Sequence, residues 1–455
     1  MGAAAAVAVA VLPGGGAGVA QTPEPVRPNV LIVMTDDQRA AGTLDVMPRT
    51  RRWFERGGTR FVNALATTPT CCPSRASVMT GLYAHNHGVR TSERGQAELL
   101  DQQLTMQRYL RREGYRTAIF GKYLNAWPRD VDPPWFDAWA ILSDSTARAY
   151  FHGRWNVNGE VRERKRYSTR IVEREALAFL KTAEGEDDAQ PWLMYLTPTS
   201  PHLPAVPHPD HARMEVPPFE PTPAMLEEDR SDKPAEVREQ TVDPKLVRQW
   251  RRRQLRSLIA VDELVGAVAR RLEKTGEAET TLAIFMSDNG FLWGEHGLAE
   301  KIRPYEASAE IPFLVRWPGR FAAGATDERL AANVDVAPTV VEAAGVEAGH
   351  EFDGRSLLTS EHDHLLLEQW KRADRTVPNW AALRAREYLY VEYYGGDRLV
   401  PTYREYYDLV ADPWELENLL GDADVTNDPR DAADLSLQLH RDVFCSGTSG
   451  ATACP

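Results

Sequence analysis

Short runs of apolar or β-branched residues recur along the chain, and four of them lead into polar residues. They cover residues 30–34, 117–120, 192–196 and 282–286. Continuous apolar runs of this length are typical of buried, largely parallel strands, which are covered on both faces. Because the C-terminal ends of parallel strands share one edge of a sheet, the polar residues after these runs should lie close together.

Helical periodicity occupies the segments between these runs. Residues 74–80 and 106–113 are expected to form helices, with Pro73 near the first turn of the former. The clearest pattern extends from about residue 246 to 274. Its apolar positions at helical spacing are Leu255, Leu258, Ile259, Leu264, Val265, Val268 and Leu272. Gly276 is expected to end this helix, and the three arginines at 251–253 are expected to form a solvated face of it.

The alternation of strand and helix patterns predicts a layered α/β domain, a sheet flanked by helices. The Pro- and acid-rich residues 204–239 are expected to form a long surface excursion. Near the C-terminus, residues 387–394 and 406–409 have the pattern of antiparallel strands joined through a Gly-Gly turn. We therefore expect a large domain over residues 26–359 and a smaller C-terminal domain with an antiparallel sheet over residues 360–455.

Composition and charge support this organisation and exclude some classes of partner. The chain has 455 residues, of which 43% are hydrophobic, enough for one large core and a smaller one. A formal net charge of -13 argues against a general nucleic-acid or anionic-membrane binder. No stretch after the N-terminus reaches the roughly 18 uncharged apolar residues of a membrane span. The net charge does not exclude an anionic substrate, because a few basic side chains in a cleft decide whether such a substrate binds.

The N-terminus and the cysteines favour an exported protein. Residues 1–20 are rich in Ala, Val and Gly and contain no charge, as in a signal peptide; a low-complexity leader is the alternative. Cys445 and Cys454 enclose a Gly/Ser/Thr-rich segment near the C-terminus. We expect them to form a disulfide, with two free thiols as the alternative.

Two pairs of oxygen-bearing side chains follow predicted strands. Asp36 and Asp37 come after residues 30–34, and Asp288 and Asn289 come after residues 282–286. Oxygen ligands suit a hard cation, Ca²⁺ or Mg²⁺, rather than zinc. Taken singly, an Asp-Asp pair is more often a helix cap, and Asp-Asn-Gly is usually a turn.

The most specific motif lies at residues 71–81, which read CCPSRASVMTG. This string resembles the signature of type I sulfatases, whose cysteine is oxidised to Cα-formylglycine. The register assigns the modified position to Cys71, because Cys72 would need a proline at position 74, where Ser74 stands. The alternative is a buried cysteine pair at a helix start. In either case Arg75 lies one helical turn after Cys71 and can reach it.

The resemblance to sulfatases covers roughly residues 29–420 and implies an alkaline-phosphatase-like fold. Three further positions match the family's lysine, histidine and lysine: Lys122, His202 and Lys301. Residues 71–77, 85–87 and 121–125 look most like N-acetylglucosamine-6-sulfatases.

Many sulfatases carry a histidine two residues after the first lysine, where this chain has Leu124. The following Asn125 is therefore expected to hydrogen-bond the substrate instead. The remaining candidates, His85, His87 and His296, either line the cleft or are structural.

The resemblance implies a sulfuric ester hydrolase with a hydrated formylglycine as nucleophile and a divalent cation, Ca²⁺ or else Mg²⁺. The implied metal ligands are Asp36, Asp37, Cys71, Asp288 and Asn289. The implied catalytic residues are Cys71, Arg75, Lys122, His202 and Lys301. The implied substrate contacts are Asn125, Lys122, His202 and Lys301. His202, aided by Lys301, would protonate the leaving oxygen.

The expected substrate is a sulfated small molecule or carbohydrate, such as N-acetylglucosamine 6-sulfate, and a formylglycine-generating enzyme is the expected partner during maturation. Two alternatives use the same site: a phosphonate monoester or phosphodiester hydrolase, and an aryl or alkyl sulfatase. A carbohydrate-binding protein with an unmodified Cys71 is the alternative without catalysis.

Overall fold

The computed structural model describes residues 1–6, 27–142, 147–186, 190–373, 375–396, 399–422, 424–429 and 431–455. The expected signal peptide lies outside the described residues from position 7 onward. In the parts of the chain that are described, no helix combines the length and apolarity that crossing a membrane requires.

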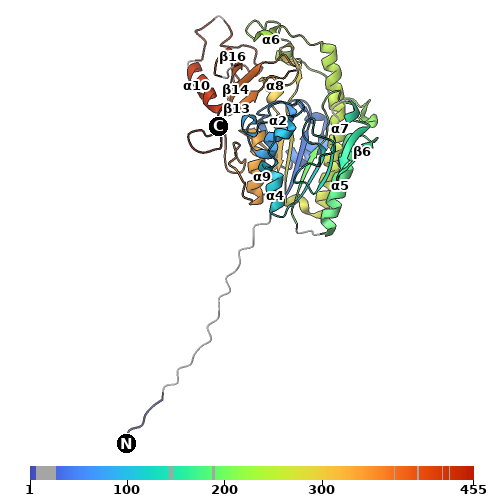
Figure 1. Cartoon of the computed structure of the whole chain (residues 1–455), viewed down its shortest axis with the longest axis vertical. Coiled ribbons are helices and arrows are strands. Elements are labelled where there is room, and N and C mark those ends of the chain that lie inside the picture. The colour runs from blue at the N-terminus through green and yellow to red at the C-terminus, as the bar shows by residue number, and fades with distance from the viewer. Residues whose placement is uncertain are drawn as a thin grey trace.

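A ten-stranded mixed sheet forms the centre of the molecule (Figure 1). Its order is β12-β2-β11-β8-β1-β7-β3-β4-β5-β6, and the run from β8 to β4 is parallel. The strands are β1 (Asn29–Thr35), β2 (Thr59–Leu65), β3 (Arg116–Lys122), β4 (Ala138–Leu142), β5 (Gly153–Val157), β6 (Glu160–Arg164), β7 (Trp192–Thr197), β8 (Thr281–Ser287), β11 (Phe313–Arg316) and β12 (Ala325–Ala332). The four strands predicted from apolar runs are confirmed and are neighbours in the parallel part.

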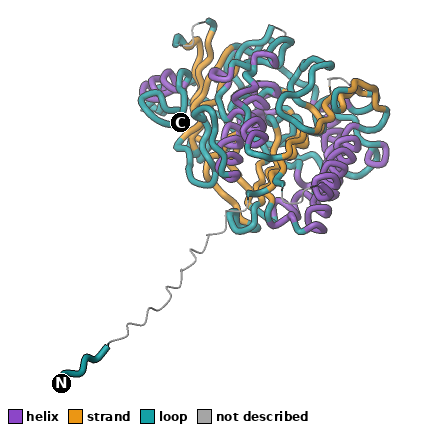
Figure 2. The backbone as a smooth tube through the Cα atoms, turned by 60° about the horizontal axis from the view of Figure 1, so that its bottom comes forward, coloured by secondary structure: helices purple, strands orange, loops and turns teal. Residues whose placement is uncertain are grey.

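Helices cover both faces of this sheet, as Figure 2 shows. On β1, Val30 and Ile32 pack into one core with α2 (Cys71–Thr80), α4 (Met106–Arg112) and α9 (Val336–Ala344). Leu31 and Val33 point the other way, into a core with α5 (Ser168–Glu186) and α7 (Pro244–Thr275). The side-chain alternation of a strand thus explains the continuous apolar run, since both faces are buried. The long helix is confirmed, and Gly276 ends it in a left-handed conformation.

A four-stranded antiparallel sheet, in the order β13-β14-β15-β16, forms the C-terminal region. It consists of β13 (His364–Gln369), β14 (Asn379–Ala385), β15 (Tyr388–Tyr394) and β16 (Pro401–Asp408), and α10 (Ala432–Asp442) lies beside it. The fold class is confirmed, although only β15 and β16 were predicted. The core of this region also contains Leu65, Tyr83 and Leu292 from before position 360, and the boundary at 360 stays a prediction.

Short elements complete the fold. They are η1 (Leu44–Val46), α1 (Pro48–Thr50), η2 (Arg51–Glu55), α3 (Ala84–His87), η3 (Ala97–Leu99), η4 (Gln102–Leu104), η5 (Ala147–Ala149), η6 (Pro209–His211), η7 (Pro223–Met225), α6 (Ala235–Arg238), η8 (Glu277–Glu279), β9 (Leu292–Trp293), η9 (Glu295–Gly297), β10 (Ala299–Glu300), α8 (Glu306–Ala309) and η10 (Asn333–Asp335). The disulfide between Cys445 and Cys454 is confirmed.

Two expectations about the surface are wrong in part. The excursion at 204–239 is not wholly exposed, because Lys233 is completely buried against Leu416 and neighbouring carboxylates. Among the three arginines of α7, Arg252 and Arg253 are exposed as expected, but Arg251 is only 6% exposed. The excursion covers Arg251, since Pro217 and Pro218 accept hydrogen bonds from its guanidinium. Tertiary contact, not helical position, therefore decides its burial.

Candidate active site

The C-terminal ends of β1 and β8 bring two pairs of polar side chains together. These strands are adjacent and parallel, with Thr35 opposite Ser287, so Asp36 and Asp37 meet Asp288 and Asn289 at one edge of the sheet. The Asp37 N–H donates to Asp288 Oδ1 at 3.0 Å. The Asn289 amide donates to Asp37 Oδ1 at 2.9 Å. The predicted convergence of the four side chains is confirmed.

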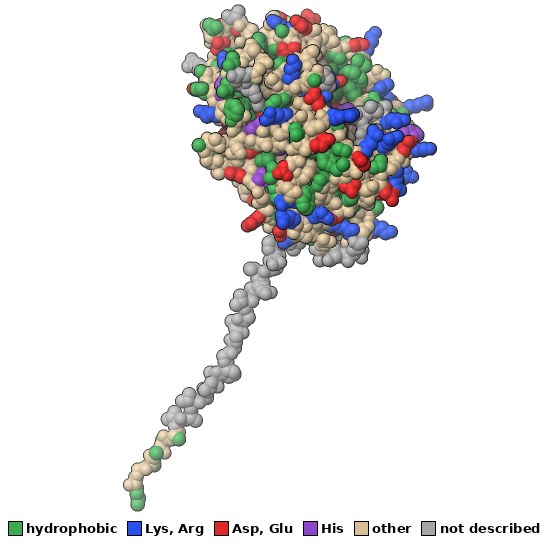
Figure 3. All heavy atoms as spheres, viewed as in Figure 1, with side chains coloured by type: hydrophobic (Ala, Val, Ile, Leu, Met, Phe, Trp, Pro, Cys, Tyr) green, Lys and Arg blue, Asp and Glu red, His purple; other side chains and the backbone are tan. Residues whose placement is uncertain are grey.

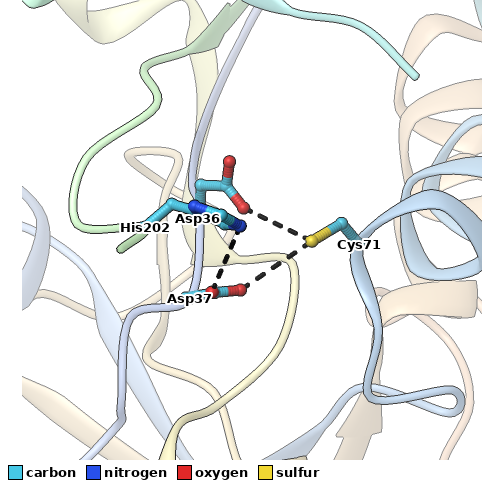
Figure 4. A group of neighbouring side chains, drawn as sticks. All are labelled: Asp36, Asp37, Cys71 and His202. Carbon is cyan, nitrogen blue, oxygen red and sulfur yellow. Dashed lines mark hydrogen bonds and ion pairs between the residues drawn. The ribbon is translucent and has the colours of Figure 1, made fainter. Parts of the chain in front are cut away.

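Cys71 is the first residue of α2, and its side chain faces the two aspartates (Figure 4). Its Sγ lies 3.5 Å from Asp36 Oδ1 and 3.8 Å from Asp37 Oδ1. Cys72 points into the apolar core instead. Burial raises the pKa of the Cys71 thiol to about 12, so an unmodified Cys71 is a neutral thiol near pH 7 and a poor nucleophile.

Arg75, one turn further along α2, fixes Asp288. Its Nε donates to Asp288 Oδ2 at 2.8 Å, and its Nη1 donates to the Lys122 carbonyl at 2.8 Å. The guanidinium is buried and lies 3.9 Å from Asp36 Oδ1. Arg75 therefore joins the helix that carries Cys71 to β8 and to the end of β3.

Two lysines and a histidine surround the same point. Lys122 Nζ donates to both oxygens of Asp36, at 3.0 and 2.8 Å. Lys301 Nζ donates to Asp37 and, at 2.7 Å, to Cys71 Sγ. His202 Nε2 lies 3.7 Å from Asp37 Oδ2, as Figure 4 shows. The three basic residues selected from the sequence therefore all lie at the strand edge with Cys71.

These cations keep the aspartates ionised. Burial by itself would raise the pKa of Asp36, but Lys122, His202 and Arg75 outweigh it and lower the pKa to about 2. For Asp37, burial again opposes the shift, and Lys301 followed by His202 lowers the pKa. Both carboxylates are consequently charged at neutral pH and available as ligands for a cation.

The donor set fits a hard divalent cation. Ligand atoms of Asp36, Asp37, Cys71 and His202 all lie within 4.8 Å of one another. Asn289 contributes a further amide oxygen, 3.5 Å from Lys301 Nζ. Carboxylate and amide oxygens are the ligands that Ca²⁺ and Mg²⁺ prefer. His202 stands beside these ligands, although nothing in the sequence around it indicates contact with Asp37.

The remaining candidates divide into two kinds. Asn125 Oδ1 is buried and has no hydrogen-bond partner among the described residues, so its substrate-binding role stays a prediction. The three histidines are engaged elsewhere: His85 with Glu368, His87 with Ser77, and His296 with Glu227. These contacts favour the structural interpretation of the histidines.

Sequence reasoning missed Tyr150, which holds the main chain at His202. Its hydroxyl donates to the His202 carbonyl at 2.5 Å, and the side chain is buried. The ring nitrogen Nδ1 of His202 lies 2.6 Å from the Leu203 carbonyl, so it must carry a hydrogen, and Nε2 is the nitrogen that faces Asp37. No sequence signal links Tyr150 to this loop, because the contact spans 52 positions.

Comparison with known proteins identifies two family models that match the chain. The sulfatase model matches residues 28–346, and the model of the N-sulphoglucosamine sulphohydrolase C-terminal region matches residues 294–440.

Several curated relatives are similar over most of the chain. An N-acetylglucosamine-6-O-sulfatase of Bacteroides thetaiotaomicron is 27% identical, over 89% of this chain and 84% of the relative. The N-acetylglucosamine-6-sulfatase of Homo sapiens is 30% identical, over 73% of this chain and 64% of the relative. The extracellular sulfatase SULF-1 homolog of Drosophila melanogaster is 33% identical over 73% of this chain. The chain spans only 31% of that relative's length and 48% of its Caenorhabditis elegans counterpart's.

Solved structures share the fold. BT4656 in complex with its substrate D-glucosamine-2-N,6-O-disulfate has a TM-score of 0.79 at 23% identity, over 91% of this chain and 97% of that chain. The phosphonate monoester hydrolase of Agrobacterium radiobacter has a TM-score of 0.71 at 23% identity, over 92% of this chain and 96% of that chain.

Proposed function

Because the chain belongs to the sulfatase family, we propose that it hydrolyses sulfate esters, and in particular a 6-O-sulfate on a glucosamine-type sugar. The observation that carries this proposal is the position of Cys71. The motif cysteine is the first residue of a helix, in contact with Asp36 and Lys301. A structural cysteine would have no need of two carboxylates and an ammonium group around its sulfur.

We infer that residue 71 acts as formylglycine. Its thiol, with a pKa raised to about 12, is inert near pH 7. Formylglycine would supply a hydrated aldehyde there, one hydroxyl for attack on sulfur and a second whose deprotonation releases the sulfate. Maturation by a formylglycine-generating enzyme is part of this proposal.

Asp36, Asp37, Asp288 and Asn289 would hold the cation that the family implies, which we expect to be Ca²⁺ and, failing that, Mg²⁺. Such an ion would lower the pKa of the nucleophilic hydroxyl. Asp288 would bind the cation while it is paired with Arg75, whose guanidinium donates a hydrogen bond to Asp288 Oδ2. Arg75 would in this way keep the ligand oriented while α2 holds residue 71 in place.

Lys122, Lys301 and His202 would contact the sulfate group. Both lysines donate hydrogen bonds into the site and His202 Nε2 faces it, each from a different part of the chain, so together they can neutralise charge that grows on the sulfate oxygens. His202 Nε2 faces Asp37, and the Leu203 carbonyl accepts the Nδ1 hydrogen, so the imidazolium form of the ring would carry its second hydrogen on Nε2 and protonate the leaving oxygen from there. Removing either lysine should lower kcat by about 10²–10³, by analogy with an oxyanion-hole donor.

Relatives support the sugar class. Those named N-acetylglucosamine-6-sulfatases match over most of this chain, and the Asn125 Oδ1, which has no hydrogen-bond partner among the described residues, would accept a hydrogen bond from a sugar hydroxyl. Export is proposed on two grounds, the signal-like N-terminus and the disulfide, which persists outside the cytosol.

The test is activity of protein matured with a formylglycine-generating enzyme. Mass spectrometry of the Cys71 peptide should find the aldehyde, and hydrolysis should be fastest on 6-sulfated glucosamines in a panel of sulfated monosaccharides and aryl sulfates. Chelation of divalent cations should abolish turnover. Faster hydrolysis of a phosphodiester or phosphonate monoester than of the sulfate ester of the same phenol would assign the site to the alternative reaction.

A further inference from the structure

Arg251 on α7 is a buried cation without a counter-ion. It is 6% exposed, and no carboxylate of the described residues lies within 4.0 Å of its guanidinium. Its partners are neutral: Nη1 donates to the Pro217 carbonyl at 2.8 Å and Nη2 to the Pro218 carbonyl at 3.1 Å. Buried charges in proteins are normally paired, because an unpaired charge in a low-dielectric interior is costly.

A second arginine increases the positive charge at this place. The guanidinium carbons of Arg39 and Arg251 lie 5.2 and 5.4 Å from the centre of the same Trp293 ring. Arg39 is neutralised by Glu295, with which it forms an ion pair. The pair of arginines therefore leaves one net positive charge, and burial together with Arg39 lowers the pKa of Arg251.

Both guanidiniums line a pocket of about 290 Å³. Its walls include Trp293, Phe219 and Thr222. The Thr222 hydroxyl is buried and has no hydrogen-bond partner among the described residues. Two carboxylates, Asp45 and Glu220, also line the pocket, but both residues are exposed, and the Asp45 carboxylate lies 3.8 Å from Arg51. Both are solvated at the rim, and neither lies within 4.0 Å of the Arg251 guanidinium, although the Asp45 charge acts on it from a longer distance.

The hydrogen-bond donors of this pocket are suited to an oxyanion. A guanidinium carries five N–H donors, and the two carbonyl bonds of Arg251 use two of them. The remaining N–H groups form the planar arrangement that matches a carboxylate or a sulfate. The Thr222 hydroxyl can supply another donor.

The pocket lies next to the active site along the chain. Arg39 follows the ligand Asp37 by two positions, and Trp293 follows Asn289 by four. The same two strand ends that build the active site thus also build this pocket.

We propose that this pocket binds an anionic group, a sulfate or a carboxylate, on a sugar unit beyond the one whose ester is cleaved. The proposal rests on the proposed function in naming a saccharide. It predicts that the enzyme prefers anionic oligosaccharides to monosaccharides, through Arg251.

Binding is tested on the full-length Cys71→Ala protein, which cannot turn over substrate. A sulfated glucosamine–uronate tetrasaccharide is titrated by calorimetry into that protein and into the same protein with Arg251→Gln or Arg253→Gln. Arg253 is the matched control, because it is the exposed member of the same arginine run. We expect Arg251→Gln to weaken binding at least tenfold and Arg253→Gln to change it less than twofold. Equal affinity of the two folded variants overturns the proposal.

Two further experiments separate structural from chemical explanations of a change in affinity. If Arg251→Gln fails to give a cooperative thermal transition, Thr222→Val replaces it, with an expected threefold loss, and unchanged affinity then overturns the proposal. Arg251-dependent binding of inorganic sulfate alone that is as tight as binding of the tetrasaccharide would assign the pocket to the free ion and overturn the saccharide assignment. Arylsulfatase activity of the matured wild type is measured separately, so failure of the proposed function is distinguishable from failure of this binding.

Discussion

Adjacent cysteines in one motif have different surroundings. The Cys71 sulfur contacts Lys301 and two aspartates, whereas the Cys72 side chain is enclosed by apolar residues. Since both thiols are buried and have raised pKa values, reactivity by ionisation does not distinguish them. The two cysteines differ instead in the direction in which each side chain leaves the first turn of α2.

Replacing these two cysteines should therefore give opposite results. Cys71→Ala should abolish sulfatase turnover with an unchanged thermal transition, because it removes the nucleophile. Cys72→Ala should keep much of the activity and lower the free energy of unfolding by about 1–2 kcal/mol, the cost of a small core cavity. Activity and calorimetry on the two variants check this, and an active Cys71→Ala would contradict it.

His202 should act on the leaving group. A poor alkyl leaving group needs protonation more than a phenol does, so His202→Ala should slow alkyl sulfates more than aryl sulfates. The ratio of the two kcat/KM losses is the measurement. Equal losses would remove the general-acid role and leave a binding role for the ring.

The loops after the strands are held by contacts from other elements. The loop that carries His202 follows β7 and is fastened by Tyr150, which lies just after η5. Likewise, Arg75 on α2 donates to Asp288 after β8 and to the carbonyl of Lys122 at the end of β3. The positions of the side chains in the candidate site therefore depend on hydrogen bonds between elements.

Removal of the Tyr150 hydroxyl tests that dependence. Tyr150→Phe keeps the ring but deletes the bond to the His202 carbonyl, and should lower kcat for alkyl sulfates by roughly tenfold, about 1.4 kcal/mol in the barrier. Tyr167→Phe is the control, because the Tyr167 hydroxyl donates to Val206 at 2.9 Å instead. Both variants should lose about 1 kcal/mol of stability. A leaving-group effect of equal size in Tyr167→Phe would show that Tyr150 does not position His202.

The molecule as a whole is closed by its C-terminal segment. The Cys445 carbonyl accepts hydrogen bonds from His85 and Asn86 of α3, each at 2.9 Å, and the Gly447 N–H donates to Asp353 at 2.8 Å. The disulfide keeps the ends of this segment together while these bonds attach it to the part of the chain before residue 360. Basic and acidic side chains are interspersed on the face shown in Figure 3, with basic ones most numerous beside β6 and α5.

Opening the disulfide should cost stability without changing the chemistry. Cys445→Ser combined with Cys454→Ser should lower the free energy of unfolding by about 2–3 kcal/mol, the loop-entropy value for a short loop. Thermal unfolding of the variant, and of the wild type with and without reductant, measures the loss. Aryl sulfatase kcat at 25 °C should not change, and an unchanged thermal midpoint would contradict the stabilising role.

A partly buried carboxylate, that of Glu310, should make stability depend on pH. Glu310 lines a cavity of about 200 Å³ beside Glu306, and burial, then Glu306, raises its pKa from 4.5 to about 7. Because the folded-state pKa is the higher one, the native state is favoured in acid, and this contribution is lost as pH rises from 4.5 through 7.

Glu310→Gln should consequently stabilise the protein above pH 7, by about 1–3 kcal/mol, and have little effect below pH 4.5. The thermal midpoint at pH 5 and pH 8 is the measurement, with Glu347→Gln, an exposed site, as the control. An equal effect at both pH values would exclude ionisation of Glu310 as the cause.

The sequence by itself determined the elements whose signal is local and the chemistry whose residues form a motif. Continuous apolar runs identify the central strands, because burial on both faces leaves no polar position in them. The cysteine motif, with Asp36–Asp37 and Asp288–Asn289 after two runs, indicated the site through its resemblance to sulfatases, and the parallel order of β1 and β8 explains why both pairs lie at one edge.

Only the tertiary structure decided which partner each charged group has. Several features depend on segments far apart in the sequence: how exposed Arg251 is, which carboxylate pairs with Arg75, the contact between Tyr150 and His202, and the burial of Lys233. Strands β13 and β14 were likewise not predicted, although both pack into a core shared with the catalytic region. Side-chain periodicity reports whether a position faces a core, but the identity of the group it meets is set by long-range packing, which a local pattern does not contain.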